Sequence, residues 1–477
     1  MSHRFSDEPT LCPKLLILLA VTFFFAALNY SRADGVDDYV KNQMRRQHVV
    51  GLSLAVVKEG RVIKARGYGL ANVELNVPAT KDTVYDIASI GKQFTATAIM
   101  MLMEDGKIGL DDRITNYLSY LPPAWSEITI RQLLTHTSGI RDYPSLPDFG
   151  KMNKSAVTTE QLVKMLADYP LQFRPGEKWK YCNIGYHLLA EIIANVSQRP
   201  YPDFLRERIF EPLGMDSTRI YDWQSIIANR ASPYSWRNGK WHNADYLDYS
   251  WAFGAGAEAS TVIDMAKWDA SLSTEKLLPK KRWEEMWTAI RLNDGSSFPY
   301  GFGWHVQTYP GDTGRVIWHG GSDPGNLTAV FHWIDDRITV IVFLTAGAEW
   351  LPNGQESSAD IAMGVSVRYI PRLFDKPIGD TYPQLTARMK ADFERLISGN
   401  LDGTEISPNW SGRKLSDIKQ WALQLSDLGK MKTFVPIWKD EAVRLYVYRA
   451  VFLKESVRFG LTLDENGKLS SIDLGIE

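Results

Sequence analysis

Cysteine is scarce in this 477-residue chain, which contains only Cys12 and Cys182. Cys12 lies ahead of an apolar run near the N-terminus, so removal of that run would leave one thiol, and one thiol forms no internal disulfide. The eight histidines also lack the paired spacing of zinc ligands. We therefore expect a fold without disulfides and an active site that uses neither a metal nor another cofactor.

A strong net charge is also absent, because 54 Lys and Arg residues face 56 Asp and Glu residues. This balance gives no electrostatic basis for binding nucleic acid or an acidic membrane surface. The apolar share of 44% and the charged share of 23% are typical of a soluble globular protein. The length exceeds that of one ordinary hydrophobic core, which predicts two domains.

The N-terminal apolar run, Leu15–Leu28, is shorter than the roughly 20 residues that span a membrane. The segment Ser31–Ala33 that follows has the small-x-small pattern of a signal-peptidase site. We therefore expect residues 1–33 to be a secretory signal peptide, with a periplasmic or secreted product that keeps no membrane span. Asp7 and Glu8 are unusual in such a peptide, so an uncleaved N-terminal anchor is the alternative.

The first elements after this segment follow from hydrophobic periodicity. Residues 36–47 predict a short amphipathic helix, and residues 51–69 predict two strands joined by a turn at Lys58–Gly60. Residues 94–103 are apolar on nearly every face, which is typical of a buried helix.

Helical and strand patterns then alternate up to residue 375. Residues 184–195 and 201–210 predict helices, and residues 326–347 predict a strand hairpin that turns at Asp335–Asp336. Strands at both ends with helices between them predict an α/β (α+β) domain over residues 34–375. We expect one antiparallel sheet flanked by helices, with an inserted all-helical lobe.

Residues 378–477 predict a small α+β domain of unknown role. Apolar spacing indicates helices over 385–396 and 415–425, followed by three strands between residues 432 and 463. The last pair of strands is expected to turn through Asn466–Gly467.

Ser89 and Lys92 form a Ser-x-x-Lys pair at the start of the predicted buried helix. A serine there lies beside free backbone N–H groups, and a lysine one turn later points the same way. Desolvation lowers the pKa of such a lysine, so it can accept a proton. The same spacing recurs without a buried helix at Ser273–Lys276, Ser411–Lys414 and Ser416–Lys419. The pair is consistent with a nucleophile and its activator or with a capping serine and a solvent-reaching lysine, and this motif alone favours the second interpretation.

A second motif, Tyr181-Cys182-Asn183, is the only Tyr-x-Asn in the chain and precedes an apolar helix. A tyrosine beside a lysine cation has a lowered pKa and can act as a base, and the Asn183 amide can donate to a substrate carbonyl. The alternative is a tyrosine that packs against the helix start, with Asn183 as its N-cap.

A third motif, His319-Gly320-Gly321, precedes a predicted strand. Its glycines allow a substrate to lie against the backbone, and the N–H groups of Ser322 and Ser89 can form an oxyanion hole. The alternative is a glycine-rich turn before a hairpin.

In this order, the three motifs resemble those of the serine beta-lactamase and penicillin-recognising hydrolase family, above all class C beta-lactamases, DD-peptidases and related esterases. The resemblance runs from about residue 36 to 372. It includes LLTHTSGI (133–140), FRPGEKWKYCNIGY (173–186), FEPLGM (210–215), GAGAEASTVIDMAKW (254–268) and YGFGWH (300–305). It implies a sheet flanked by helices and an all-helical lobe, with the cleft between them.

The resemblance also implies roles for single residues. Ser89 would be the acylated nucleophile, and Lys92 and Tyr181 would share the general-base work as a coupled pair. Tyr181 would then activate the deacylating water. Substrate binding would fall to Asn183, His319, Gly320, Gly321 and Ser322.

Two departures from the family pattern bear on the substrate. His319-Gly320-Gly321 stands where beta-lactamases usually have Lys-Thr-Gly, whose lysine and threonine are associated with binding a substrate carboxylate. Histidine is mostly neutral at pH 7 and Gly320 has no hydroxyl, which weakens the case for penicillins and D-alanyl-D-alanine termini. Cys182 replaces the usual serine with little expected consequence, and His136 is expected to be a structural loop residue.

The sequence therefore predicts an exported serine hydrolase that acts through an acyl-enzyme on small-molecule or peptide esters, or on amides without a bound carboxylate. A cell-wall enzyme, either a DD-carboxypeptidase, a D-aminopeptidase or a beta-lactamase, is the first alternative. A non-catalytic binding protein that retains the cleft is the second, although a binder has no need of serine, lysine, tyrosine and asparagine together.

Overall fold

The computed structural model describes residues 35–222, 224–308, 314–345, 347–348, 357–370, 373, 378–401, 405–408, 425–440, 444–453 and 456–476. The predicted signal peptide and residues 415–424 of a predicted helix lie outside this part of the chain. Within it, no helix combines the length and the apolar character that a membrane crossing requires.

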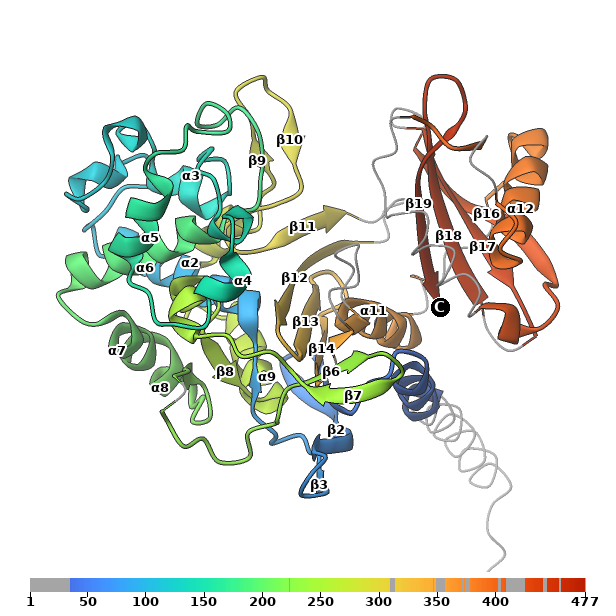
Figure 1. The fold of residues 1–477 in the computed structure, drawn as a ribbon, viewed down its shortest axis with the longest axis horizontal. Coiled ribbons are helices and arrows are strands. Elements are labelled where there is room, and N and C mark those ends of the chain that lie inside the picture. The colour runs from blue at the N-terminus through green and yellow to red at the C-terminus, as the bar shows by residue number, and fades with distance from the viewer. Residues whose placement is uncertain are drawn as a thin grey trace, which may run out of the picture.

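The centre of the main body is a seven-stranded sheet with the order β11-β12-β13-β14-β1-β2-β3 (Figure 1). Its strands are β1 (Gly51–Lys58), β2 (Arg61–Asn72), β3 (Val77–Pro78), β11 (His305–Thr308), β12 (Arg315–Asp323), β13 (Asn326–Trp333) and β14 (Ile338–Thr345). Every pairing in it is antiparallel, and β1 joins β14, so the N-terminal strands complete a sheet built from the other end of the domain. The predicted antiparallel sheet and both of its hairpins are confirmed.

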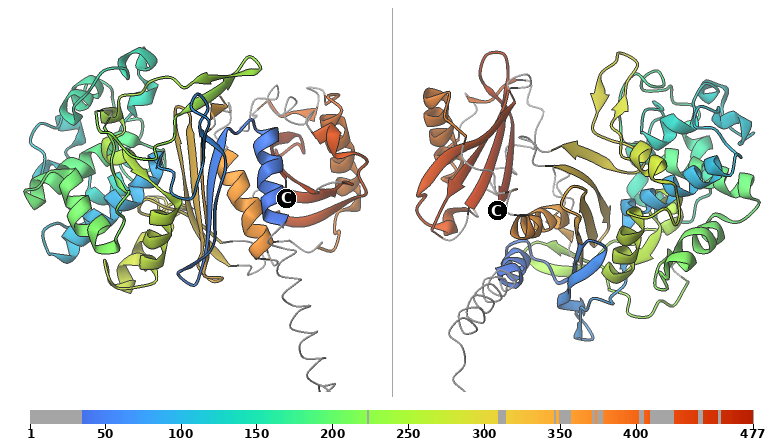
Figure 2. Two further views of the ribbon diagram at one scale, coloured as in Figure 1. Left: turned by 90° about the horizontal axis from the view of Figure 1, so that it is seen from below. Right: turned by 180° about the vertical axis from the view of Figure 1, so that it is seen from behind.

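The sheet is covered on both faces because its strands alternate their apolar side chains. Leu54 and Val56 belong to one hydrophobic cluster, whereas Ala55 and Val57 belong to another. The first cluster includes the helical segment 35–46, as predicted, and α11 (Ser357–Tyr369). The second joins the sheet to the helical lobe, which lies on one side of the sheet in both views of Figure 2.

The lobe contains the predicted all-helical insertion. Its elements include α2 (Lys92–Glu104), α3 (Ile130–Leu134), α5 (Thr159–Leu166), α6 (Asn183–Ser197), α7 (Tyr201–Leu205) and α8 (Glu211–Leu213), with α9 (Val262–Leu272) against the sheet. The helix predicted over 201–210 is α7 followed by a π-helical turn, Arg206–Phe210.

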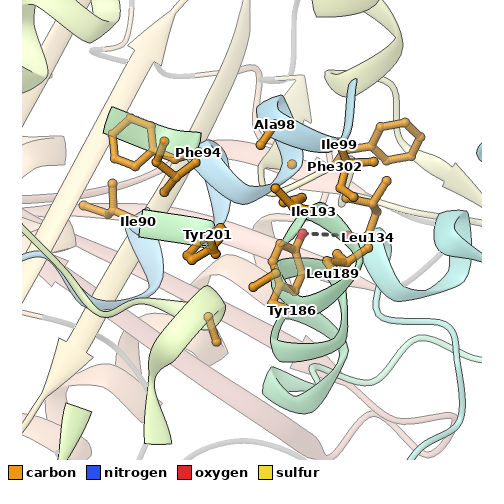
Figure 3. Packing of buried hydrophobic residues seen from close by; sticks show 14 of the residues in the cluster. Ile90, Phe94, Ala98, Ile99, Leu134, Tyr186, Leu189, Ile193, Tyr201 and Phe302 are labelled. Carbon is orange, nitrogen blue, oxygen red and sulfur yellow. Dashed lines mark hydrogen bonds between the residues drawn. The ribbon is translucent and has the colours of Figure 1, made fainter. Parts of the chain in front are cut away.

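Helix α2 is the centre of the lobe, and every residue from Lys92 to Leu102 is buried, as predicted. Phe94 packs edge-on against Phe210 and Trp268, with ring centroids 5.1 and 4.8 Å away. Figure 3 shows the side chains of α2 packed among those of α6 and α7, with the Tyr186 hydroxyl bonded to the Leu134 carbonyl. The start of α2 is therefore fixed by packing on all sides.

Two sequence-based predictions of local structure are wrong. The alternative of a glycine-rich turn at His319-Gly320-Gly321 is wrong, because these residues lie within β12, ahead of β13, and glycine there permits the close approach of another segment. The C-terminal part has four strands rather than three, because the Asn466–Gly467 turn leads from β18 (Ser456–Leu463) into β19 (Leu469–Ile476).

The C-terminal part forms an antiparallel sheet in chain order, β16 (Thr433–Asp440), β17 (Leu445–Val451), β18 and β19. The predicted helix α12 (Pro383–Ile397) contributes Met389 and Phe393 to a hydrophobic core that is separate from the two clusters of the main sheet. Figure 1 shows this sheet and α12 beside the main body, on the side of α11.

One acidic side chain is buried behind the start of α2. Glu258 begins β8 (Glu258–Ser260), which pairs with β4 (Tyr85–Asp86) and β5 (Arg219–Ile220). Its Oε1 accepts a hydrogen bond from the Tyr201 hydroxyl (3.2 Å), and its Oε2 has no partner in the described part of the chain. Burial raises the pKa of Glu258 to about 8, so the carboxyl is largely protonated at pH 7.

The substitution Glu258→Gln should remove a pH dependence of stability. The folded protein keeps the Glu258 proton up to about pH 8, whereas the unfolded chain releases it near pH 4.5. The free energy of unfolding of the wild type should therefore fall as the pH rises through this window, by up to about 1.4 kcal/mol per pH unit. In urea denaturation, the free energy of unfolding of the variant relative to that of the wild type should increase by about 2 kcal/mol or more from pH 5 to pH 8.

The matched control is Glu127→Gln, because the Glu127 side chain is exposed. Its free energy of unfolding should change between the two pH values as that of the wild type does. Equal pH dependence in the wild type and Glu258→Gln would show that Glu258 is ionised in the folded protein.

Candidate active site

Ser89 lies in a 3-10 turn, η1 (Ala88–Gly91), that leads directly into α2. Ala88 has a left-handed backbone conformation (φ 47°), which is uncommon for a residue with a side chain and turns the chain sharply before Ser89. Two glycines let neighbouring segments close on this turn. A Cβ at Gly256 would collide with the backbone of Ala88 and Ser89, and one at Gly321 with the carbonyl of Ile87.

Lys92 is completely buried, and its Nζ donates to three oxygens. These are Ser89 Oγ (2.9 Å), Asn183 Oδ1 (2.9 Å) and the Ala255 carbonyl (2.6 Å). The amide and carbonyl oxygens can only accept, so two N–H groups stay directed at them. When the amine loses a proton, its lone pair therefore faces Ser89, whose hydroxyl can donate to it. The burial excludes the alternative of a solvent-reaching lysine.

Burial also sets the protonation of this amine. It lowers the pKa of Lys92 from 10.5 to about 7, against the opposing effect of the carboxyls of Asp142, Glu258 and Asp323. A substantial fraction of the molecules therefore carries a neutral amine at pH 7. This is the state in which a lysine can take a proton from a neighbouring hydroxyl.

Asn183 is oriented by Asp142, a residue that no sequence motif singled out. Asp142 Oδ2 accepts from Asn183 Nδ2 (2.8 Å), and Oδ1 accepts from the backbone N–H of Ile184 (3.1 Å). A carboxylate only accepts, so the Asn183 NH₂ must face Asp142 and its Oδ1 must face Lys92. The N-cap of α6 is Cys182, without a side-chain cap, so the alternative of Asn183 as N-cap is wrong.

Tyr181 lies beside the amine, with its ring centroid 4.9 Å from Lys92 Nζ. His136 packs against this ring with a centroid distance of 4.3 Å. The Nδ1 of His136 accepts the N–H of Cys182 (3.2 Å), and its carbonyl accepts the N–H of Lys180 (2.9 Å). His136 thus holds the chain on both sides of Tyr181, which is a structural loop role that positions the phenol.

A hydrogen-bonded chain connects His136 to His319 through Tyr300. The Tyr300 hydroxyl lies 3.1 Å from Nε2 of each ring, and Nδ1 of His319 lies 2.6 Å from the Gly320 carbonyl. Nδ1 of His136 already accepts from Cys182, so its Nε2–H must donate to Tyr300. Nδ1–H of His319 must donate to the carbonyl, which leaves its Nε2 to accept from Tyr300.

Both rings in this chain are neutral at pH 7. Burial lowers the pKa of His136 and of His319 well below the ordinary value for histidine, and the nearby Lys92 acts in the same direction. His319 therefore supplies no positive charge where the family pattern has a lysine.

The segment from His319 to Ser322 lies along an open stretch of sheet edge. Strand β11 pairs with β12 only up to Trp318, and beyond it β12 pairs with β13 alone among the described strands. Ser322 lies opposite Leu327 in this pairing. An unpaired edge offers backbone groups to an extended ligand, and Gly320 leaves it without a side chain at that point.

The structure thus brings Ser89, Lys92 and Asn183 into direct contact, with Tyr181 beside them, and reaches His319 through Tyr300. Sequence reasoning did not find the positioning roles of Asp142 and Tyr300, which depend on contacts between distant segments. The only available signal was that Tyr300 lies in the YGFGWH stretch. Within the described residues, no group of three or more His, Cys, Asp or Glu side chains is arranged to hold a metal ion.

Comparisons with known proteins identify the family and the fold. Residues 36–362 match the family model described as Beta-lactamase. The chain is 30% identical over 310 residues to Penicillin-binding protein 4* of Bacillus subtilis, covering 62% of this chain and 68% of that protein.

Two solved structures share the fold. One is the octameric penicillin-binding protein homologue from Pyrococcus abyssi (TM-score 0.62, 23% identity), which covers 93% of this chain and 98% of its own. The other is D-amino acid amidase from Ochrobactrum anthropi SV3 in complex with L-phenylalanine amide (TM-score 0.61, 27% identity), which covers 72% and 98%. The chain therefore belongs to the Beta-lactamase family, as a serine hydrolase of the fold shared by beta-lactamases and penicillin-binding proteins.

Proposed function

We propose that this protein hydrolyses esters, or amides that carry no bound carboxylate, through an acyl-enzyme on Ser89. The observation that carries the proposal is the environment of Lys92, whose amine is buried and donates to the Ser89 hydroxyl, 2.9 Å away, a partner that can in turn donate to the neutral amine. A binding protein gains nothing from burying a lysine at this cost in desolvation. The intact arrangement therefore favours an enzyme over a non-catalytic binder.

The proposed reaction begins with the neutral amine of Lys92. It accepts the proton of Ser89 as Oγ attacks the substrate carbonyl carbon, and the N–H groups of Ser89 and Ser322 stabilise the oxyanion that forms. Lys92 and Tyr181 pass the proton to the leaving group, which departs and leaves the acyl group on Oγ. Water activated by Tyr181 then attacks the ester, and the proton returns to Ser89.

The substrate preference is argued from what the β12 edge lacks. Burial keeps His319 neutral and Gly320 has no hydroxyl, so neither can pair with a carboxylate. This argues against penicillins and C-terminal D-alanine peptides as preferred substrates. The likeness to a D-amino acid amidase at 27% identity makes an amidase or D-aminopeptidase activity the second candidate.

We also propose that the protein is exported to the periplasm or secreted, with residues 1–33 as its signal peptide. The apolar run Leu15–Leu28 and the small-x-small pattern after it support this proposal. An uncleaved anchor would place the same domain on the outer side of the membrane.

A fluorophosphonate probe tests the nucleophile. It should label the wild type and leave Ser89→Ala unlabelled, because only an activated serine attacks phosphorus at a useful rate. Ser273→Ala is the matched control, since Ser273 has the same Ser-x-x-Lys spacing but is exposed, and its hydroxyl donates to the Ala270 carbonyl. Equal labelling of Ser89→Ala and the wild type, read by intact-protein mass spectrometry, would reject Ser89 as the nucleophile.

The role of Lys92 is tested by Lys92→Met, which keeps an unbranched side chain of similar length but removes the proton acceptor. Phosphonylation of Ser89 by the same probe, with loss of fluoride, should slow about 10²- to 10⁴-fold. In the wild type, the labelling rate should rise with pH through about 7, because the amine acts as a base only after it loses its proton. A wild-type labelling rate that is flat between pH 5.5 and 8.5 would contradict this role.

A further inference from the structure

Three buried oxygen atoms close to the nucleophile have no hydrogen-bond partner in the described part of the chain: Asp86 Oδ1, Asp323 Oδ2 and Asn326 Oδ1. They belong to one cluster, since Asn326 Nδ2 donates to Asp86 Oδ2 (3.1 Å), and Asn326 lies opposite Asp323 across the β12–β13 turn. Oxygen atoms of these kinds accept hydrogen bonds, so these three atoms lack donors, whereas Asp86 Oδ2 also accepts from the Tyr249 hydroxyl.

The cluster adjoins both proposed oxyanion donors. Asp86 ends β4, three residues before Ser89, and Asp323 follows Ser322 directly on β12. Side chains two apart on a strand share a face, so Asp323 lies on the same face as Gly321, which abuts the carbonyl of Ile87. Asp323 is partly exposed as a residue although its Oδ2 is buried, whereas Asp86 and Asn326 are buried as whole residues.

The two carboxyls also lack a bonded cation. No ion pair to Asp86 or Asp323 occurs among the described residues, and the guanidinium of the exposed Arg230 is bonded to the Tyr221 hydroxyl instead. Burial raises the pKa of Asp323 well above its ordinary value, and the neighbouring Asp86 adds to this effect. Burial likewise raises the pKa of Asp86, to about 6. A positively charged donor placed here would relieve both effects.

The direction of the leaving group decides which part of the substrate reaches the cluster. In the proposed mechanism, the leaving group receives its proton from Lys92 or Tyr181 and would depart on their side of Ser89. The acyl part would then extend along the β12 edge past Ser322, which Asp323 follows directly. An acyl substituent next to the scissile carbonyl would face the unpartnered oxygens.

We propose that Asp323, supported by Asp86 and Asn326, forms a subsite for a protonated amino group on the acyl part of the substrate, as in an amino-acid ester or amide with a free amine. This inference rests on the proposed acyl-enzyme mechanism and names its substrate class. His319 and Gly320 cannot recognise a carboxylate. The proposed subsite would recognise a positively charged ammonium instead.

The test compares esters that differ only in this group. The methyl esters of D-alanine and L-alanine carry an ammonium where methyl isobutyrate carries a methyl group. Their kcat/KM values, measured by methanol release, are divided by their hydroxide-catalysed rate constants, because the ammonium also activates the ester chemically. The wild type should prefer at least one alanine ester by tenfold or more after this correction.

The variants Asp323→Asn and Asp323→Ser should reduce that preference at least fivefold. Two variants are used so that a folding defect in one does not decide the outcome. Asp82→Asn, an exposed carboxyl paired with Lys81, is the matched control and should keep the wild-type preference.

The remaining outcomes separate the two proposals. Ser89-dependent hydrolysis of methyl isobutyrate with no preference for either alanine ester, or a preference that both Asp323 variants retain, would overturn the ammonium subsite and leave the acyl-enzyme mechanism standing. No hydrolysis of any ester, together with no fluorophosphonate labelling of Ser89, would reject the proposed function and this inference with it.

Discussion

The burial of a single amine is the constraint on which the rest of this site depends. A lysine inside a helix that is apolar on every face loses its hydration, and the free-energy cost appears as a pKa lowered to about 7. The protein limits that cost by giving Nζ three oxygen partners. Desolvation favours the neutral amine, which is a base. Because two of the three partners can only accept, the lone pair of this amine faces the one hydroxyl. A more amphipathic α2 would hydrate the amine and remove this property.

The surrounding structure keeps these partners in place through contacts between distant segments. Asp142 fixes the Asn183 amide, His136 holds the chain around Tyr181, and Gly256 and Gly321 allow the backbone to close on the turn that carries Ser89. None of these contacts is local in sequence. The sheet makes them possible, because β12 and β14 belong to the same rigid layer as β1, from which the chain passes through β4 to Ser89.

The sequence predicts the parts of this fold that depend on local chemistry. The turn at Lys58–Gly60 and the helix α2 follow from turn residues and from apolar continuity, which act over a few residues. The position of His319 within β12 could not be predicted this way, since two glycines are typical of a turn unless another segment packs against them. The positioning role of Asp142 also has no local signal, because its partners begin a helix some 40 positions further along the chain.

The same electrostatic reasoning links the amine to the choice of substrate. Asp142, Glu258 and Asp323 all stabilise the charged form of Lys92, so each buried carboxyl near the cleft opposes the desolvation that makes the lysine a base. Glu258 does little harm because it is largely protonated at pH 7. Asp323 differs because it lies beside the substrate path that we propose. An ammonium bound there would neutralise its effect on Lys92, lowering the amine's pKa when the correct substrate is present. Recognition of a cationic acyl group and activation of the base would then be one electrostatic event.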